Sequence, residues 1–389
     1  MVDWDSIVFN SCAFICALFV LEFGADKFVD HTAVVSRRLG VSEVLVALLT
    51  AGAEWEELAV VTASLSRGRS SIAVGNVIGS SISNILGAFS LGLIFHRRGV
   101  TAIVYDGSAK IYSTILLLVS TAIPVAFLLK GTASKVYGGV LIGTFVVYVG
   151  SVLWGISRGR MTAPELSDDD SSDDSDSDGE SDDGSIGVEA PRQAVEDEEA
   201  GLSRDEIGGQ SEVIRLRSLT PKKPVRNPRP SRPKHGLMYH ILHLLLGFFC
   251  IGLSGYILSH TSSSIATDLQ ISDVFFGVVV LALATTLPEK FVAILSGFRG
   301  QPGIMVANTV GSNIFLLTLC LGIVMVSTGD DFDSGSVSII ELAIMWVSTL
   351  ALAGTVWFWG KWTRMVGVGM LALYIAFLAL EISLTVRGK

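Results

Sequence analysis

The sequence predicts an all-α, polytopic membrane protein with about ten transmembrane helices in two inverted five-helix repeats. Half of its 389 residues are apolar and only 17% are charged, and its mean hydropathy is +0.57, which excludes an ordinary soluble domain. The apolar residues gather in runs long enough to cross a bilayer, and a polar motif occurs twice within them. We therefore expect neither a catalytic enzyme nor a nucleic-acid-binding protein.

Ten apolar runs have the length of about 20 residues that a helix needs to cross the hydrocarbon core. The first is interpreted as a permanent span, because acidic residues precede it and no small-residue cleavage site follows. The four cysteines all lie in apolar runs without metal-ligand spacing and are interpreted as packing residues. The predicted spans are residues 6–28, 41–65, 72–95, 111–130, 136–157, 239–259, 270–296, 303–326, 338–359 and 365–386.

A hydrophilic stretch, residues 158–238, separates an N-terminal membrane half (1–157) from a C-terminal one (239–389). Its first part is rich in Asp and Ser and is expected to be disordered and open to a kinase. Its second part is basic and proline-containing, and could attract anionic lipid headgroups. The distribution of Lys and Arg in the short loops predicts that this stretch is cytoplasmic and that the N-terminus lies outside.

The repeated motif occupies residues about 50–87 and about 282–321. Glu57 and Glu289 are 232 residues apart, and the same offset relates the two Asn-x-x-Gly-Ser segments that begin at Asn76 and Asn308. Five predicted crossings lie between the two glutamates, and an odd number inverts the second copy. Two inverted halves are the plan of secondary transporters, with the substrate site near the middle of the bilayer.

Ionisable residues within transmembrane segments are costly and indicate function. On a helix, residues three and four apart share a face, so Glu54 should lie beside Glu57, and Thr285 and Thr286 beside Glu289. Polar residues also form a stripe at helical spacing in the first repeat, Asn76, Ser80 and Asn84, and their counterparts in the second repeat are Asn308, Ser312 and the apolar Leu316. Such a set of carboxylate, hydroxyl and amide oxygens suits a hard cation such as Ca2+ or Na+.

Other interpretations exist for these acidic residues. A buried glutamate can be a hydrogen-bonding group that pairs helices. Glu22, Asp26 and Lys27 in the first span are interpreted as a local ion pair near the membrane boundary, with a role in an ion pathway as the alternative.

The second motif reads Ala-Thr-Thr-Leu-Pro-Glu at 284–289 and Ala-Asn-Thr-Val-Gly-Ser-Asn-Ile-Phe at 307–315, and looser copies stand at 52–58 and 75–84. These segments resemble the alpha repeats of the sodium/calcium exchangers in the cation/Ca2+ exchanger superfamily. The resemblance covers both membrane halves but not the acidic loop. It implies ten helices, antiport of Ca2+ against Na+ or another monovalent cation, and alternating access at a central site.

The resemblance also implies a set of cation ligands. The chain departs from the family pattern at Ala53 and Glu54, which stand where the family has Thr and Ser and are kept in the set, and at Glu56, Lys290 and Leu316, the last of which replaces an acidic or amide ligand. The residues that match family ligands are Glu57, Glu289, Ser80, Asn84, Thr285, Thr286 and Ser312.

We expect a Ca2+ antiporter with Na+ as counter-ion and no cofactor, in the plasma membrane or an internal calcium-storing membrane. A Ca2+/H+ exchanger is the second interpretation, because carboxylates held close in a low dielectric can trade a proton for a cation. A third, of another class, is a transport-dead membrane sensor whose acidic loop is the working part. The altered first repeat and Lys290 favour it.

Overall fold

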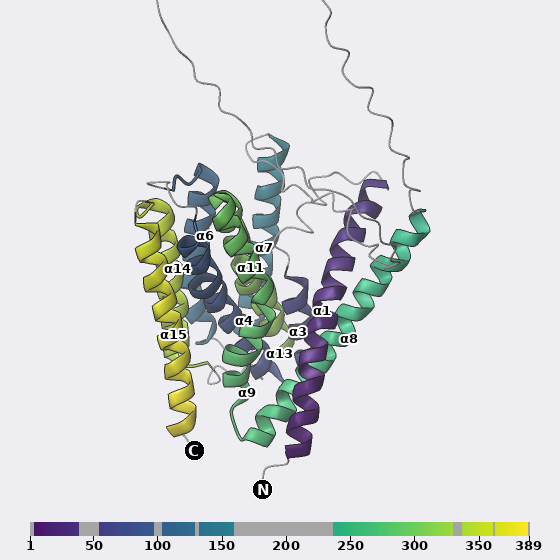
Figure 1. Ribbon diagram of the computed structural model, residues 1–389. Coiled ribbons are helices and arrows are strands. Elements are labelled where there is room, and N and C mark those ends of the chain that lie inside the picture. Colours follow the sequence, from purple (N-terminus) through teal and green to yellow (C-terminus); the bar gives the residue numbers. More distant parts are fainter. Residues whose placement is uncertain are drawn as a thin grey trace, which may run out of the picture. The chain divides into compact units, whose positions relative to one another are not determined.

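The computed structural model describes residues 4–38, 54–96, 103–128, 132–158, 236–329, 337–360 and 362–387, and these ranges are helical without a strand (Figure 1). The first half contains α1 (Trp4–Arg38), α3 (Trp55–Ser66), α4 (Ser70–Ile82), the π-helix η1 (Ser83–Phe89), α5 (Ser90–Ile94), α6 (Gly107–Ala126) and α7 (Thr132–Ser157). The second half contains α8 (Leu237–Leu269), α9 (Asp273–Phe275), the π-helix η2 (Phe276–Leu281), α10 (Ala282–Thr285), α11 (Leu287–Arg299), α12 (Pro302–Ile314), the π-helix η3 (Phe315–Cys320), α13 (Leu321–Thr328), α14 (Ile339–Trp357) and α15 (Thr363–Arg387).

Within the described ranges, eight helices or continuous helical runs are long and apolar enough to cross a membrane. A ninth span is the pair Asp273–Thr285 and Leu287–Arg299, whose two parts meet at an angle of 47°. The predicted span 41–65 is described only from Glu54 onward, and its earlier part lies outside the described residues. The acidic and basic parts of the long loop also lie outside them, so a kinase and an anionic lipid remain predictions as partners.

The helix α8 begins at Leu237 and continues to Leu269, past the predicted end of that span at residue 259. The predicted span ends at residue 259 because polar residues follow it. In the structure Thr261 donates its hydroxyl hydrogen to the carbonyl oxygen of Ile257 at 2.9 Å. Hydroxyl groups satisfied by the preceding turn do not end a helix, and here they allow α8 to reach α9.

The offset of 232 residues applies to the helices as well as to the motifs. The bounds of α4 and α12 differ by 232 at both ends, and α6 and α14 begin 232 residues apart. The capping residues agree too: Asp106 accepts a hydrogen bond at the start of α6 and Ser338 does so at the start of α14. The helices α1 and α8, which open the two halves, lie side by side and run in opposite directions (Figure 1).

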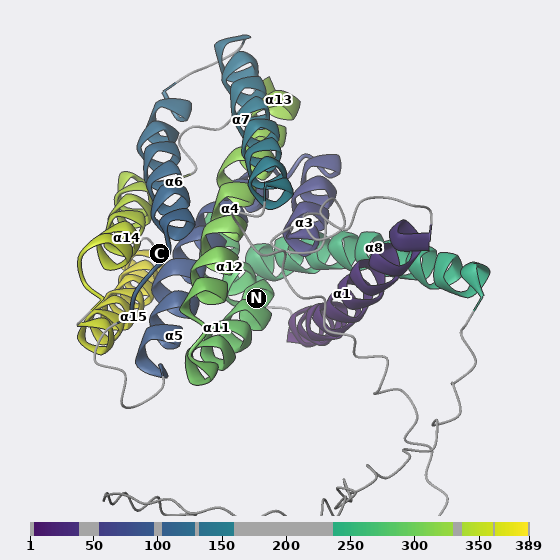
Figure 2. The same ribbon diagram turned by 90° about the horizontal axis from the view of Figure 1, so that it is seen from above.

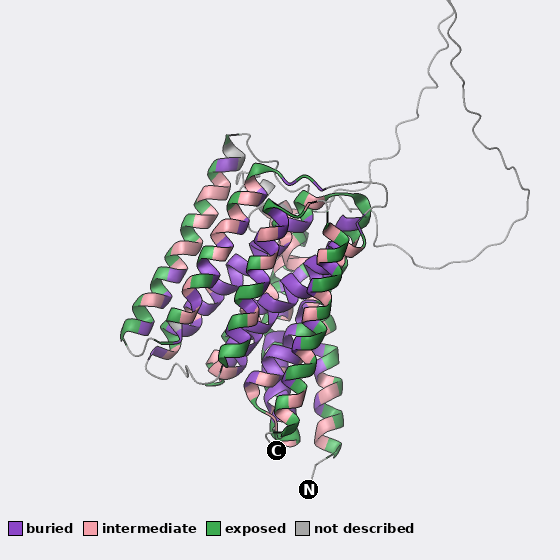
Figure 3. Cartoon of the chain, turned by 90° about the vertical axis from the view of Figure 1, so that its left-hand side faces the viewer, coloured by how far each residue is buried: buried purple, intermediate pink, exposed green. Residues whose placement is uncertain are grey.

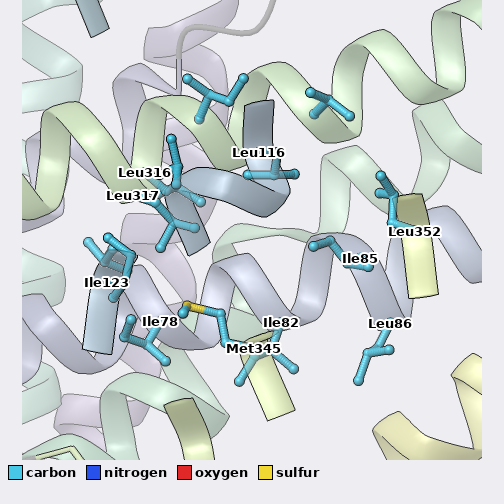
Figure 4. Packing of buried hydrophobic residues seen from close by; sticks show 14 of the residues in the cluster. Ile78, Ile82, Ile85, Leu86, Leu116, Ile123, Leu316, Leu317, Met345 and Leu352 are labelled. Atoms are coloured by element: carbon cyan, nitrogen blue, oxygen red, sulfur yellow. The ribbon is translucent and has the colours of Figure 1, made fainter. Parts of the chain in front are cut away.

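The helices that carry the repeated motif form the centre of the molecule. Of the 18 most apolar consecutive residues in Ser70–Ile94, 89% are buried, against 11% of those in Thr132–Gly155, and buried residues gather in the inner helices (Figure 3). Seen from above, α4 and α12 lie between α14 and α15 on one side and α1 and α8 on the other (Figure 2). The core around α4 is apolar, and Ile78 and Ile82 of α4 lie close to Met345 of α14 (Figure 4). This packing surrounds the polar positions of both repeats.

The backbones of the two halves approach closely where α4 crosses α9 and η2. A Cβ atom at Gly79 would lie 2.6 Å from the Cα atom of Val278, and one at Gly75 would lie 2.8 Å from the carbonyl oxygen of Val274. Glycine is needed at such a crossing because any side chain would push the helices apart. The contact places Ser80, the next residue, at the junction between the two repeats.

Candidate cation site

The two repeated glutamates occupy the same place in equivalent helices. Glu57 lies in the first turn of α3 and Glu289 in the first turn of α11. Before Glu289 the chain breaks at Thr286, which has φ of −91° and ψ of 16°, and Pro288 removes a backbone donor and prevents a continuous helix. Carboxylates in the first turn are favoured by the helix dipole, so α3 and α11 each hold a glutamate at the N-terminal end.

Glu57 is fully buried, and Glu289 is half-buried with its Oε2 atom shielded from solvent. The side chains interact electrostatically with each other. The carboxyl groups of the two repeats therefore interact with each other within the membrane-spanning part of the chain. Their combined charge of two matches that of one Ca2+ ion.

Glu54 is the residue before α3, with non-helical φ of −78° and ψ of 72°. The structure therefore differs from the expectation that Glu54 and Glu57 share a helical face, because the helix begins only at Trp55. The carboxyl group of Glu54 nevertheless interacts with those of both Glu57 and Glu289. Its side chain is 6% exposed, so it belongs to the buried group of carboxyls rather than to a solvent-filled entrance.

Several polar atoms near these carboxyls are buried and have no hydrogen-bond partner among the described residues. A buried polar group left unsatisfied costs about 1–3 kcal/mol, so these atoms are available to bind water or a cation. The elements that carry them are in mutual contact, since η1 contacts α4, α11 and α12, and α3 contacts α4. The atoms are both carboxylate oxygens of Glu57, Oε2 of Glu289, both amide atoms of Asn76 and Asn84, and the hydroxyl oxygens of Ser80 and Ser312.

The two threonines of the second motif are buried beside the break before α11. Thr285 donates its hydroxyl hydrogen to the carbonyl oxygen of Leu281 at 3.1 Å, and Thr286 donates to that of Ala282 at 2.6 Å. The hydroxyl oxygen of Thr285 keeps lone pairs that can accept, whereas that of Thr286 already accepts from Lys290 at 2.6 Å and lies 2.8 Å from the hydroxyl group of Ser83. Ala53, which the sequence analysis included among the ligands, lies outside the described residues.

Three residues near the site were not identified from the repeat pattern as part of a polar cluster. The ammonium group of Lys290 is buried and donates to Ser83 and Thr286, and the hydroxyl group of Tyr374 also donates to Ser83. Lys290 had a signal in the sequence, because it is a charged residue in an apolar run. Ser83 and Tyr374 had none, because only the fold brings η1 and α15 together.

Further carboxyls lead outward from the site. Glu56 interacts electrostatically with Glu54 on one side and with Glu22 and Asp26 of α1 on the other. Exposure rises along this series: Glu54 is buried, Glu56 and Glu22 are half-buried and Asp26 is exposed. Asp26 also interacts electrostatically with Lys27, and both interpretations of the α1 residues stay predictions.

The profile of the sodium/calcium exchanger protein family matches residues 9–154 and 239–383 of the chain. The chain belongs to the sodium/calcium exchanger family. Members of this family are transporters, and its two matched regions are the two membrane halves. The family predicted from the motifs is thereby confirmed, and the protein is a multi-pass cation antiporter of the exchanger type.

Individual relatives of this exchanger agree with the assignment. It is 23% identical over 367 residues to the "Putative antiporter CaxA" of Alkalimonas amylolytica, covering 94% of this chain and 95% of the relative. It is 26% identical over 163 residues to human sodium/potassium/calcium exchanger 4, covering 40% of this chain and 26% of the relative. The fold resembles a solved structure of the sodium-calcium exchanger NCX_Mj soaked with Na+ and Sr2+, with a TM-score of 0.53, 19% identity and coverage of 96% of this chain and 99% of the other. This likeness confirms the predicted fold class.

Proposed function

We propose that this exchanger moves Ca2+ against Na+ by alternating access, with the cations held by Glu57, Glu289 and the neutral oxygens around them. The observation that carries the choice of Na+ is the set of unpartnered amide and hydroxyl oxygens, which includes Ser80, Asn84 and Ser312. Ca2+ needs several oxygens in either kind of exchanger, but a proton as counter-ion needs only a carboxylate oxygen, whereas Na+ must also be given oxygens in place of its hydration shell. The neutral oxygens supply what the carboxylates alone cannot.

Exchange of Ca2+ for protons is the second candidate. It is favoured by the crowding of carboxyl groups, since Glu54, Glu56, Glu57 and Glu289 all interact with one another or through a shared neighbour. Like charges so close together are unfavourable unless a cation or a proton separates them. A proton could do so in the absence of Ca2+.

The counter-ion can be determined with the purified full chain in liposomes. Vesicles loaded with Na+ are diluted into Na+-free medium containing tracer Ca2+, and a matched set receives an imposed pH gradient with N-methylglucamine in place of Na+. We expect uptake that follows the Na+ gradient, survives a protonophore and collapses with a Na+ ionophore. Uptake that follows only the pH gradient would establish the proton exchanger, and no uptake under either gradient would favour the transport-dead sensor.

Replacing Glu54 with serine should weaken Ca2+ uptake by about tenfold, an effect typical of losing one supporting ligand, at both low and high ionic strength. The reason is that a ligand contacts the cation directly and is little affected by salt, whereas a charge in an open entrance acts through a field that is screened within about 10 Å at 0.1 M salt. Adding Leu316→Asp should partly restore uptake, because η3 lies beside the carboxyls. Cys320, on the same helix as Leu316, interacts electrostatically with Glu57 and Glu54.

The initial rate of uptake is measured at several Ca2+ concentrations in 20 to 500 mM salt, a range chosen to span roughly the change in screening length. A defect of Glu54→Ser that disappears at high salt, with no rescue by Leu316→Asp, would show that Glu54 only attracts cations to the entrance. The matched control is Asp26→Asn, an exposed acid whose effect should be confined to low salt.

A further inference from the structure

Lys290 is the only Lys or Arg among the described residues that is buried, with 9% of its side chain exposed. It directly follows Glu289 and lies in α11, a membrane-spanning segment. A cation in such a place is costly unless it is fully paired, and it is then a mark of function. The proposed exchange of Ca2+ gives it no role.

The ammonium group has three donors, and each of them has an acceptor. Lys290 Nζ lies 2.9 Å from Ser83 Oγ, 2.6 Å from Thr286 Oγ1 and 3.0 Å from the carbonyl oxygen of Thr286. Ser83 and Thr286 are themselves joined at 2.8 Å, and the hydroxyl group of Tyr374 donates to Ser83 at 3.0 Å. The ammonium group is therefore surrounded by neutral oxygens of η1 and of the break before α11, and Tyr374 of α15 is hydrogen-bonded to the same serine.

The surroundings are shaped around this side chain. A Cβ atom at Gly87 would lie 3.2 Å from Lys290 Cε and 3.4 Å from Tyr374 Cε1, so glycine leaves the room that the lysine uses. The ammonium group interacts electrostatically with Glu289 and, more weakly, with Glu57. The ammonium group thus has its own set of hydrogen-bond acceptors and also interacts electrostatically with the two carboxyls proposed to hold the substrate cation.

We propose that the Lys290 ammonium group is a covalently attached cation that fills a monovalent-cation subsite beside the Ca2+ carboxylates. Hydroxyl and carbonyl oxygens are the groups with which proteins replace the water around an alkali cation, and an ammonium group carries the same charge. Because the lysine cannot leave, the exchanger moves one monovalent cation fewer in each cycle than the same site would without it. This inference rests on the proposed exchange of Ca2+.

The test compares the wild type with Lys290→Met in liposomes. The variant should still exchange Ca2+, with two changes. Its dependence on the concentration of Na+ or K+ should become steeper, with a Hill coefficient higher by about one, since one more ion must bind. The charge moved per Ca2+, measured as a reversal potential under opposed gradients, should change by about one elementary charge, whichever way the added ion travels. Lys110→Met, which removes an ammonium that lies 5.5 Å from the ring of Trp357, is the matched control and should behave like the wild type.

Binding is measured separately by thermal unfolding in detergent. Na+ or K+ should raise the unfolding temperature of Lys290→Met relative to N-methylglucamine at equal ionic strength, and should raise that of the wild type less. Failure to recover Lys290→Met or Lys290→Gln as folded protein in any alkali salt would overturn the inference, since the ion would then not replace the ammonium group.

The two proposals fail in different ways. A wild type that neither transports Ca2+ nor is stabilised by it contradicts the proposed function. A wild type that exchanges Ca2+, with a Lys290→Met variant of unchanged salt dependence and unchanged charge per Ca2+, contradicts only the role of Lys290.

Discussion

Replacing Glu57 or Glu289 with glutamine is expected to reduce Ca2+ uptake by at least about 100-fold, more than the loss seen when only a supporting ligand is removed. The amide keeps the size of the side chain but removes the negative charge that Ca2+ requires from its ligands. Glu57 is fully buried and its carboxylate oxygens accept no hydrogen bond from the described residues, and glutamine fills the same space. Both variants should therefore remain folded.

The control for this prediction is Glu381→Gln. Glu381 is also a buried carboxyl in a membrane helix, on α15, but it interacts with Glu341 rather than with the cation site. Uptake by this variant should stay near the wild-type rate, and size-exclusion profiles should be alike for all three. Substantial Ca2+ uptake by a folded Glu57→Gln or Glu289→Gln protein would mean that the cation is held elsewhere.

Changing Gly79 to alanine should lower the unfolding temperature and nearly abolish transport. A Cβ atom there would lie 2.5 Å from the carbonyl oxygen of Val278 and 2.8 Å from the Cβ atom of Ala282. Neither neighbour is the end of a flexible side chain, so α4 and η2 must separate. Overpacking of this kind costs about 1–3 kcal/mol, and the separation also displaces Ser80 from the junction of the repeats.

Thermal unfolding in detergent and Ca2+ uptake in liposomes measure the two effects of Gly79→Ala. Gly150→Ala is the matched control, because nothing lies within 4 Å of a Cβ atom at this position of α7. If both variants unfolded at the wild-type temperature and transported Ca2+ equally well, the close crossing of α4 and η2 would not be needed.

The fold could be predicted well from the sequence because two sequence features, neither of which depends on tertiary contacts, indicate it. Apolar runs of sufficient length mark spans, and a motif that recurs with the same spacing as Glu57 and Glu289 marks the repeat. The prediction was less accurate where helix ends matter. Glu54 was placed on a helix that in fact begins one residue later, because its polarity and spacing fit both positions.

The hydrogen-bonding surroundings of Lys290 could not be predicted from the sequence pattern. Ser83 lies in a π-helix, whose bonds reach one residue further than those of an α-helix, so the spacing rules of an α-helix do not give its direction. Tyr374 belongs to α15, far from either motif in sequence. Only the packing of these helices shows that both residues contact the same site.

The correspondence of positions 232 apart bears on the direction in which the exchanger works. Inverted halves exchange their conformations as the site opens to one side and then the other, so identical halves would make the two open states equal in energy. Here Glu54 corresponds to Thr286, Leu58 to Lys290 and Ser83 to Phe315. The two open states therefore hold their charges in different surroundings, and we expect a rectifying exchanger whose half-saturating Ca2+ concentration, measured in oriented vesicles, differs between the two faces of the membrane.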